Sequence, residues 1–275
     1  MLAMTLLFVF VGDRMFGGGG AVLFLALATL MNFGMYWWSH KVVLRMYKAQ
    51  IVDRSQAPGL YARVDALRRR AGLPMPVVAI SSQKQANAFA TGRNPENAVV
   101  CFTQGILSGL PDRELDGVIA HELAHIKHRH MLVGTVAATM AGAIGMIASI
   151  ARWGAIFGSS NDDGDNPLAL LVMAIVAPLA AVVIQMAISR RNEFQADRTG
   201  GEITGDPMGL ARALRRLEQG AGRIPMNVNP AGAALAIVHP FGGMRRGMTT
   251  LFRTHPPTEE RVAALRQQAD GVRAG

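Results

Sequence analysis

The segment His121-Glu122-Leu123-Ala124-His125 places two imidazoles and a carboxylate within five residues. Residues i and i+4 lie on one face of a helix, so His121 and His125 can both reach one zinc ion at about 2.0–2.1 Å. Glu122 can take a proton from zinc-bound water and later deliver it to a leaving amine. The spacing therefore predicts a hydrolytic zinc site of the HExxH type. Because His128 and His130 follow closely, a histidine-rich polar helix face without metal is the alternative interpretation.

A catalytic zinc ion needs a third protein ligand and one open position. The extended pattern HExxHxxGxxH would supply a distal histidine, but this chain has His128 at the glycine position and Met131 at the last histidine position. A carboxylate from another helix is the second option. Glu193 and Asp197 are spaced i, i+4, so Glu193 can complete a His/His/Glu set while Asp197 orients an imidazole. An ordinary charged helix face remains the alternative for this pair.

The chain also contains four apolar runs, which determine how the candidate ligands can be placed relative to a membrane. Three are uncharged or nearly so and about as long as a bilayer is thick: Gly20 to Trp38, Met131 to Ile150 and Pro167 to Ser189. The fourth, Met1 to Gly12, is too short to span unaided, and we expect it to pair with Gly20 to Trp38 as a hairpin. The alternative for each long run is a buried core helix. The alternative for Met1 to Gly12 is the core of a signal peptide.

The distribution of charge predicts the orientation of the spans. Half of the 275 residues are hydrophobic, 17% are charged, and the net charge is +9. Lys and Arg gather in 41–130 and after Ser189, whereas the connection 151–166 is mainly acidic, so the basic segments should face the cytoplasm. This topology and anionic lipid explain the basic excess without nucleic acid. The expected divisions are 1–40 and 131–189 as transmembrane hairpins, with 41–130 and 190–275 as the two cytoplasmic catalytic parts.

The segments outside the apolar runs carry signals for a small catalytic fold. Apolar residues recur at helical spacing in 56–73, and Pro111 should open the helix that carries the HExxH segment. We also expect helices over 207–219 and 257–269, and irregular structure over 220–250. Val77 to Ser81 and Ala98 to Phe102 are short β-type runs, and between them lie Ala86 to Ala90 and the turn-rich segment 91–97. This pattern suggests a small antiparallel sheet. The predicted fold class is mainly α with this sheet, in an integral membrane protein with a zincin-like (HExxH gluzincin) catalytic domain.

Four blocks in order along the chain resemble HtpX-type membrane zinc proteases, which are related to the CaaX prenyl-protein endopeptidases. The blocks are Asn87 to Gly92, Val118 to His125, Ser189 to Asp197 and Thr254 to Arg261. This resemblance implies that Glu193 is the third zinc ligand and Asp197 its structural neighbour. It further implies cleavage of membrane or misfolded proteins at the cytoplasmic side of the inner membrane, often under stress.

Several further residues gain meaning from the resemblance. Asn87, Ala88 and Phe89 would lie on an edge strand beside the metal, which could hold an extended peptide by main-chain hydrogen bonds. His255 could act electrostatically near the site, and Arg190 could orient a carboxylate. The structural alternatives are an ordinary sheet strand, a turn histidine before a closing helix, and an arginine that anchors the chain at the membrane.

Two other functions compete with a zinc endopeptidase that acts on unmodified proteins. Processing of prenylated proteins shares the motifs, although such relatives usually have more spans. A structural or transported zinc is disfavoured, because the single cysteine, Cys101, is far from the motif in sequence and the long runs hold no ionisable residue. Cys101 lies in an apolar stretch and is expected to be a buried core residue rather than a nucleophile. The sequence does not specify an oligomeric state.

Overall fold

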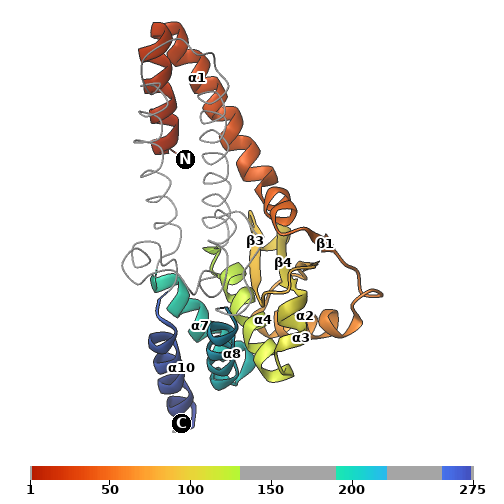
Figure 1. The fold of residues 1–275 in the computed structure, drawn as a ribbon. Coiled ribbons are helices and arrows are strands. Elements are labelled where there is room, and N and C mark those ends of the chain that lie inside the picture. Colours follow the sequence, from red (N-terminus) through yellow and green to blue (C-terminus); the bar gives the residue numbers. More distant parts are fainter. Residues whose placement is uncertain (1, 131–189, 222–255, 274–275) are drawn as a thin grey trace, which may run out of the picture.

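The computed structural model describes residues 2–130, 190–221 and 256–273. In this part of the chain, helices predominate over a single small sheet (Figure 1). The helices are α1 (Leu2–Met46), α2 (Pro58–Ala71), α3 (Gln104–Gly109), α4 (Asp112–Lys127), α7 (Arg190–Thr204), α8 (Pro207–Ala221) and α10 (Thr258–Arg273), with a short 3-10 turn, η1 (Pro95–Asn97). The strands are β1 (Ala49–Ile51), β2 (Val77–Ser81), β3 (Ala88–Gly92) and β4 (Ala98–Thr103). The helices expected over 56–73, 207–219 and 257–269 are thus present as α2, α8 and α10.

The sheet has the strand order β1-β2-β4-β3 and is mixed. β1 pairs antiparallel with β2, and β3 pairs antiparallel with β4, but β2 and β4 run parallel, with Val78 opposite Val100. The expectation of a wholly antiparallel sheet is therefore wrong. β2 and β4 run parallel because the connection 82–87 carries the chain past the position next to β2 before β3 begins. β4 then returns to that position, between β2 and β3.

Thr103 holds this connection in place. Its hydroxyl donates a hydrogen bond to the Gln85 carbonyl at 2.8 Å and accepts one from the Asn87 amide at 2.9 Å. The same oxygen also caps α3 by accepting from the Ile106 amide at 3.2 Å. One side chain therefore fixes where β3 begins, where β4 ends and where the next helix starts.

Side chains alternate between the two faces of the sheet, as the period of a strand requires. Val78, Val100 and Phe102 face a core shared with α2, α3, α4 and α8. Val99 and Cys101 face the other way and pack with Phe89 against Tyr47 at the end of α1. The sheet thus separates α2, α3, α4 and α8 from the base of the N-terminal hairpin.

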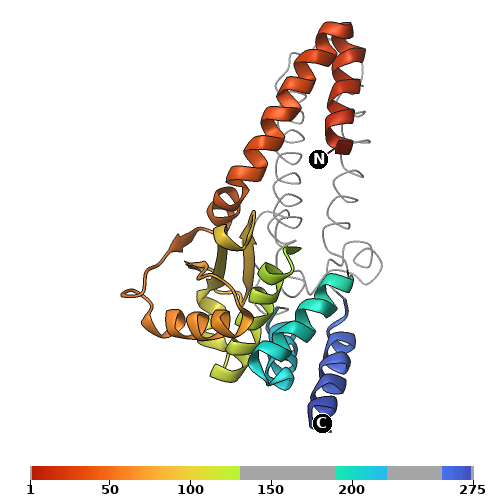
Figure 2. The same cartoon turned by 180° about the vertical axis from the view of Figure 1, so that it is seen from behind.

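Helix α4 is the centre of the helical layer and contacts α7, α8, α2 and β3 (Figures 1 and 2). Two glycines allow this close packing. A Cβ atom at Gly117 would lie 2.6 Å from the Leu210 nitrogen of α8, and one at Gly200 would lie 3.1 Å from the His121 nitrogen. The second contact matters for the site, because it brings the backbone of α7 against that of a predicted metal ligand.

The element α1 doubles back on itself and projects from the rest of the structure as a narrow hairpin (Figure 1). Its two arms are joined by a hydrogen bond from Asn32 Nδ2 to Thr5 Oγ1 at 2.9 Å and by a contact between the rings of Phe8 and Phe24. Within the described residues, one stretch, Gly18–Trp38, is long and apolar enough to cross a membrane. Its large apolar side chains are mostly exposed, Leu30 to 68%, which fits contact with lipid better than a buried core helix.

The other predicted spans, Met131 to Ile150 and Pro167 to Ser189, lie outside the described residues, as does most of 220–250. Cys101 is fully buried, as expected for a core residue. Burial, together with the nearby charge of Glu122, raises the pKa of the Cys101 thiol to about 12, so the thiol stays protonated at neutral pH.

Candidate metal centre

Helix α4 supplies the first two candidate ligands and the candidate base. It begins after Pro111, and Asp112 and Glu114 lie in its first turn, where carboxylates interact favourably with the helix dipole. Residues 121–126 are all buried except His125, which is partly exposed, and His121 is exposed to only 1%. A helix this deeply buried holds its histidines in fixed positions relative to the sheet and to α7.

Glu193, in the first turn of α7, brings the third candidate ligand to the two histidines. Ligand atoms of His121, His125 and Glu193 all lie within 4.8 Å of one another. The two Nε2 atoms are 3.1 Å apart, and the Glu193 carboxylate oxygens lie 3.4 Å from His125 Nε2 and 3.7 Å from His121 Nε2. Ligands of a tetrahedral zinc ion are separated by about 3.3 Å when each bond is about 2.0–2.1 Å. The donor set and its spacing therefore fit zinc.

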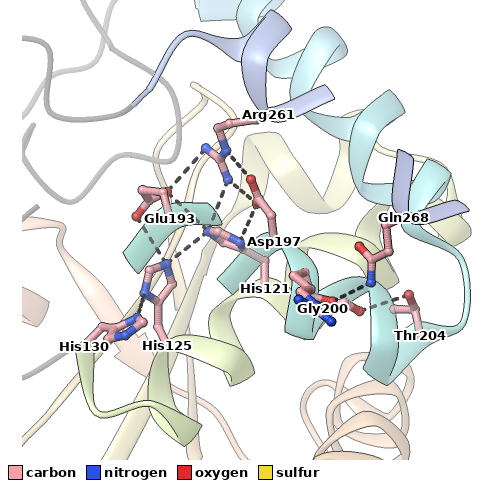
Figure 3. A network of polar contacts seen from close by, with 10 residues as sticks. His121, His125, His130, Glu193, Asp197, Gly200, Thr204, Arg261 and Gln268 are labelled. Carbon is pink, nitrogen blue, oxygen red and sulfur yellow. Dashed lines mark hydrogen bonds and ion pairs between the residues drawn. The ribbon is translucent and has the colours of Figure 1, made fainter. Parts of the chain in front are cut away.

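Behind His121, a buried ion pair holds the ring (Figure 3). Asp197 Oδ1 lies 3.0 Å from His121 Nδ1, and both oxygens of Asp197 accept hydrogen bonds from Arg261, at 2.7 Å and 2.6 Å. Arg261 Nη1 also lies 3.4 Å from Glu193 Oε2. A carboxylate on the far nitrogen of a metal-binding imidazole directs the other nitrogen toward the metal.

These contacts shift the pKa values of Asp197 and His121. Burial alone raises the pKa of Asp197, but the charge and hydrogen bonds of Arg261, with those of His121, outweigh it and lower the pKa to about 2. Burial likewise lowers the pKa of His121, whereas the hydrogen bond and charge of Asp197 outweigh burial and raise it. Asp197 is thus ionised at every pH where the protein would act, and it pairs with Arg261 and His121.

The formal charges at this site favour a divalent cation. Glu122, Glu193 and Asp197 are carboxylates exposed to 4%, 3% and 1%, and Arg261 contacts two of them, Glu193 and Asp197. Buried carboxylates are costly unless positive charge balances them. A dication bound by neutral histidines and Glu193 would add positive charge where these carboxylates gather.

The other predicted residues lie in several places. Arg190 is the first residue of α7 and is exposed. Phe89 packs on the face of the sheet turned toward α1, where its ring lies 4.5 Å from that of Tyr47, and Ala88 faces the helical core. The Asn87 side chain is buried and donates to Tyr47 Oη at 3.3 Å. His255 lies outside the described residues.

β3 is an edge strand of the sheet, as expected, and contacts α4. Its other edge is bonded to β4, and all five of its residues are buried. The strand that would hold a peptide therefore lies against the helix that carries the histidines.

Two residues beside the ligands had no role in the sequence-based prediction. Arg261 falls within the block Thr254 to Arg261, but nothing in its spacing links it to Asp197, 64 residues earlier. His130 was seen only as part of a histidine-rich segment, yet its Nδ1 lies 3.2 Å from His125 Nδ1. The i, i+5 spacing of these two histidines could have been a signal only if the chain were known to turn after α4.

Comparison with known proteins agrees with this geometry. Residues 54–269 match the family model described as Peptidase family M48. A protein of Gemmatimonas aurantiaca named "Protease HtpX homolog" is 56% identical over 272 residues, which cover 98% of this chain and 96% of the relative. A protein of the same name from Salinibacter ruber is 52% identical over 269 residues, covering 98% and 95%. The resemblance to HtpX-type proteases is thereby confirmed.

A solved structure shares the fold at much lower identity. The crystal structure of S. mikatae Ste24p is 20% identical, with a TM-score of 0.51 over 96% of this chain. This chain corresponds to 62% of the Ste24p chain. By its sequence over residues 54–269 and its relatives over nearly the full length, the chain belongs to peptidase family M48.

Proposed function

We propose that this chain is a membrane-anchored zinc endopeptidase that hydrolyses peptide bonds of membrane or misfolded proteins on the cytoplasmic side of the membrane. One observation carries the proposal: His121, His125 and Glu193 come from two helices far apart in sequence, yet their ligand atoms lie within 4.8 Å of one another, with His121 and Glu193 buried and His125 partly exposed. Exposed acidic clusters are common in proteins, but a largely buried His/His/Glu set beside a further carboxylate is typical of hydrolytic zinc sites.

The residues of the chain divide the chemistry among them. A bound zinc ion would polarise the scissile carbonyl and lower the pKa of a water molecule. Glu122 adjoins the ligand His121 and is the candidate to accept a proton from the attacking water and return it to the leaving amine. Asp197 and Arg261 hold His121 in one tautomer and orientation through the contacts described above.

Substrate binding is proposed along the edge of β3 that is turned away from β4. A peptide that adds to this edge in extended form would be held by main-chain hydrogen bonds, largely independent of its sequence. Such a mode suits loosely folded protein segments, which can present an extended backbone. The neighbouring contact of β3 with α4 would bring the bound peptide to the histidines.

The membrane anchor and the cytoplasmic orientation rest on the apolar hairpin and on the charge pattern. Gly18–Trp38 exposes its apolar side chains, and Lys41, Arg45 and Lys48 follow directly at its end, as the positive-inside rule expects for a cytoplasmic flank. The proposal includes a role in the removal of damaged membrane proteins under stress, as the resemblance to HtpX-type proteases implies.

The test is to replace Glu122 by Gln in the full-length chain purified in detergent. Glu122→Gln keeps the size of the side chain and leaves the three ligands intact, so zinc content should stay at one per chain. Cleavage of an unfolded, unmodified protein should fall about 10²–10⁴-fold, because the proton acceptor is lost. Glu218→Gln, an exposed change on α8, is the matched control and should leave both quantities unchanged.

Turnover by zinc-loaded Glu122→Gln at the rate of the parent chain would refute the proposed role of Glu122 and the hydrolytic assignment. A prenylated peptide, assayed beside the unmodified protein, addresses the substrate. Cleavage of the prenylated peptide alone would instead favour processing of prenylated proteins.

A further inference from the structure

His130 lies just beyond the end of α4 and contacts a candidate zinc ligand on the side away from the metal. Its Nδ1 is 3.2 Å from Nδ1 of His125, and the centres of the two rings are 5.3 Å apart (Figure 3). His125 Nε2 is the nitrogen that faces His121 and Glu193. The two nitrogens of His125 are therefore engaged on opposite sides.

The backbone brings His130 to this position through an unusual residue. α4 ends at Lys127, the His128 amide donates back to the Ala124 carbonyl, and Arg129 then has a φ of +58°. A residue other than glycine in the left-handed region carries a conformational cost and is uncommon. Here the left-handed residue turns the chain at the end of the helix, and the next side chain, His130, lies against His125.

When zinc is bound to His125, the positions of the protons determine which histidine donates in the contact between His125 and His130. A neutral imidazole that binds metal through Nε2 carries its hydrogen on Nδ1, and this N–H needs an acceptor. His121 has Asp197 at that nitrogen, 3.0 Å away. At His125 the partner is His130 Nδ1, which must then be unprotonated and accept the hydrogen bond.

We infer that His130 is a positioning residue for the metal centre: it accepts a hydrogen bond from His125 Nδ1–H and so fixes the tautomer and ring orientation of the second zinc ligand. The inference rests on the proposed zinc site and adds to it a counterpart of Asp197. The two histidines would then be held by different acceptors, a charged carboxylate for His121 and a neutral imidazole for His125.

The neighbouring His128 serves a different purpose and provides a control. Its Nε2 is 2.9 Å from Thr199 Oγ1 and its Nδ1 is 3.2 Å from Gln195 Nε2, so both ring nitrogens face α7. His128 joins two helices, whereas His130 contacts a ligand. Its ring also stacks on that of His130, with ring centres 5.4 Å apart.

The test compares zinc affinity, measured by competition with a chelator, in full-length His130→Asn, His130→Gln and His130→Leu. An Asn side chain places its oxygen where Nδ1 of histidine lies, whereas Gln reaches to the position of Nε2. We expect Leu and Gln to weaken zinc binding about 10–100-fold and Asn to recover most of the loss. The absorption bands of the cobalt-substituted protein should change in Leu and Gln but stay close to the parent in Asn.

His128→Phe keeps a ring that can stack on His130 but loses both ring nitrogens, so it should keep the zinc affinity of the parent. The unfolding temperature of each zinc-free variant separates loss of metal from loss of fold. Parent-like affinity in His130→Leu, or equal weakening in Asn and Gln, would overturn the inference, and so would weakening in His128→Phe equal to that in His130→Leu. If the parent chain itself bound no zinc, the proposed function would fail instead, so the two failures can be told apart.

Discussion

The residues of the site are more deeply buried than their charges would ordinarily permit. Asp197 and Arg261 are each exposed to only 1%, and they meet through two short hydrogen bonds. A bidentate pair between arginine and a carboxylate is rigid as well as strong. Since the same carboxylate contacts His121, the pair determines where that imidazole points. Stability and metal binding are therefore coupled through one side chain.

Asp197→Asn tests this coupling. The amide keeps the shape but loses the charge, which removes the carboxylate that contacts the buried guanidinium of Arg261 most closely. We expect the free energy of unfolding to fall by roughly 3–5 kcal/mol, the cost of breaking a buried ion pair. The zinc dissociation constant should rise about 10–100-fold. Chemical denaturation and chelator competition on the same preparation measure the two effects.

Asp65→Asn is the matched control for that change. Asp65 pairs with Arg68 and Arg69 on the surface of α2, where ion pairs contribute roughly 0–1 kcal/mol. Its zinc affinity should equal that of the parent. A result in which Asp197→Asn is as mild as Asp65→Asn would show that the buried pair does not hold the site.

At this scale the sequence nominates residues that the structure brings together, but it gives no sign of the residues that support them. His121, Glu122 and His125 follow from helical periodicity, and Glu193 with Asp197 from a second i, i+4 pair, so local spacing was enough to nominate them. Arg261 and His130 reach the site through tertiary packing and through the turn at Arg129, and neither leaves a periodic signal.

At the scale of the elements, the site depends on the distance between α4 and α7. Glu193 can approach the histidines only if α7 lies close to α4, and Gly200 is a residue where α7 lies against the backbone of α4. An added Cβ there would meet the backbone of His121 at 3.1–3.2 Å. A larger side chain must push the two helices apart or break the packing beside the ligand.

Gly200→Leu should therefore weaken zinc binding by at least as much as loss of a supporting hydrogen bond, about 10-fold or more. It should also lower the unfolding temperature, because overpacking typically costs about 1–3 kcal/mol. Gly59→Leu on α2, where an added Cβ meets nothing within 4 Å, is the control. Zinc binding by Gly200→Leu equal to that of Gly59→Leu would contradict the role given to this contact.

The sheet shows why strands are easier to predict than their order. Short apolar, β-type runs located Val77–Ser81 and the strand that begins at Ala98, because that signal is local. Which strand pairs with which depends on the path of 82–87, held by Thr103, and the chain skips a position there. The wholly antiparallel arrangement failed for this reason, whereas the edge position of β3 was predicted correctly.

For the whole molecule, the central feature is the hairpin of α1 at one end and the helices α8 and α10 at the other (Figures 1 and 2). The base of the hairpin is attached to the sheet through Tyr47, which is fully buried. Its ring packs against Phe89, and its hydroxyl accepts a hydrogen bond from the Asn87 side chain. Arg93, in the turn between β3 and β4, also lies over the ring of Trp37 at 4.2 Å. The edge strand is thus joined to the anchor at both of its ends.

The proposed orientation in the membrane can be tested with single cysteines. The native Cys101 is fully buried, so it should react little with a maleimide that cannot cross membranes. Ser108→Cys on exposed α3 should be labelled only when the cytoplasmic side is opened, and Ser159→Cys in the loop 151–166 should be labelled in intact cells. The reverse pattern would contradict the orientation, and labelling of both in intact cells would contradict the spans.

The proposed function requires that one zinc ion is bound by two imidazoles and by a carboxylate from a different helix. X-ray absorption at the zinc edge of the full-length, zinc-loaded chain tests it most directly. We expect one zinc per chain, nitrogen and oxygen neighbours at about 2.0–2.1 Å, scattering from two imidazoles, and a changed spectrum with reduced zinc content in Glu193→Ala. A sulfur neighbour at about 2.3 Å, or a spectrum and zinc content unchanged in Glu193→Ala, would contradict it.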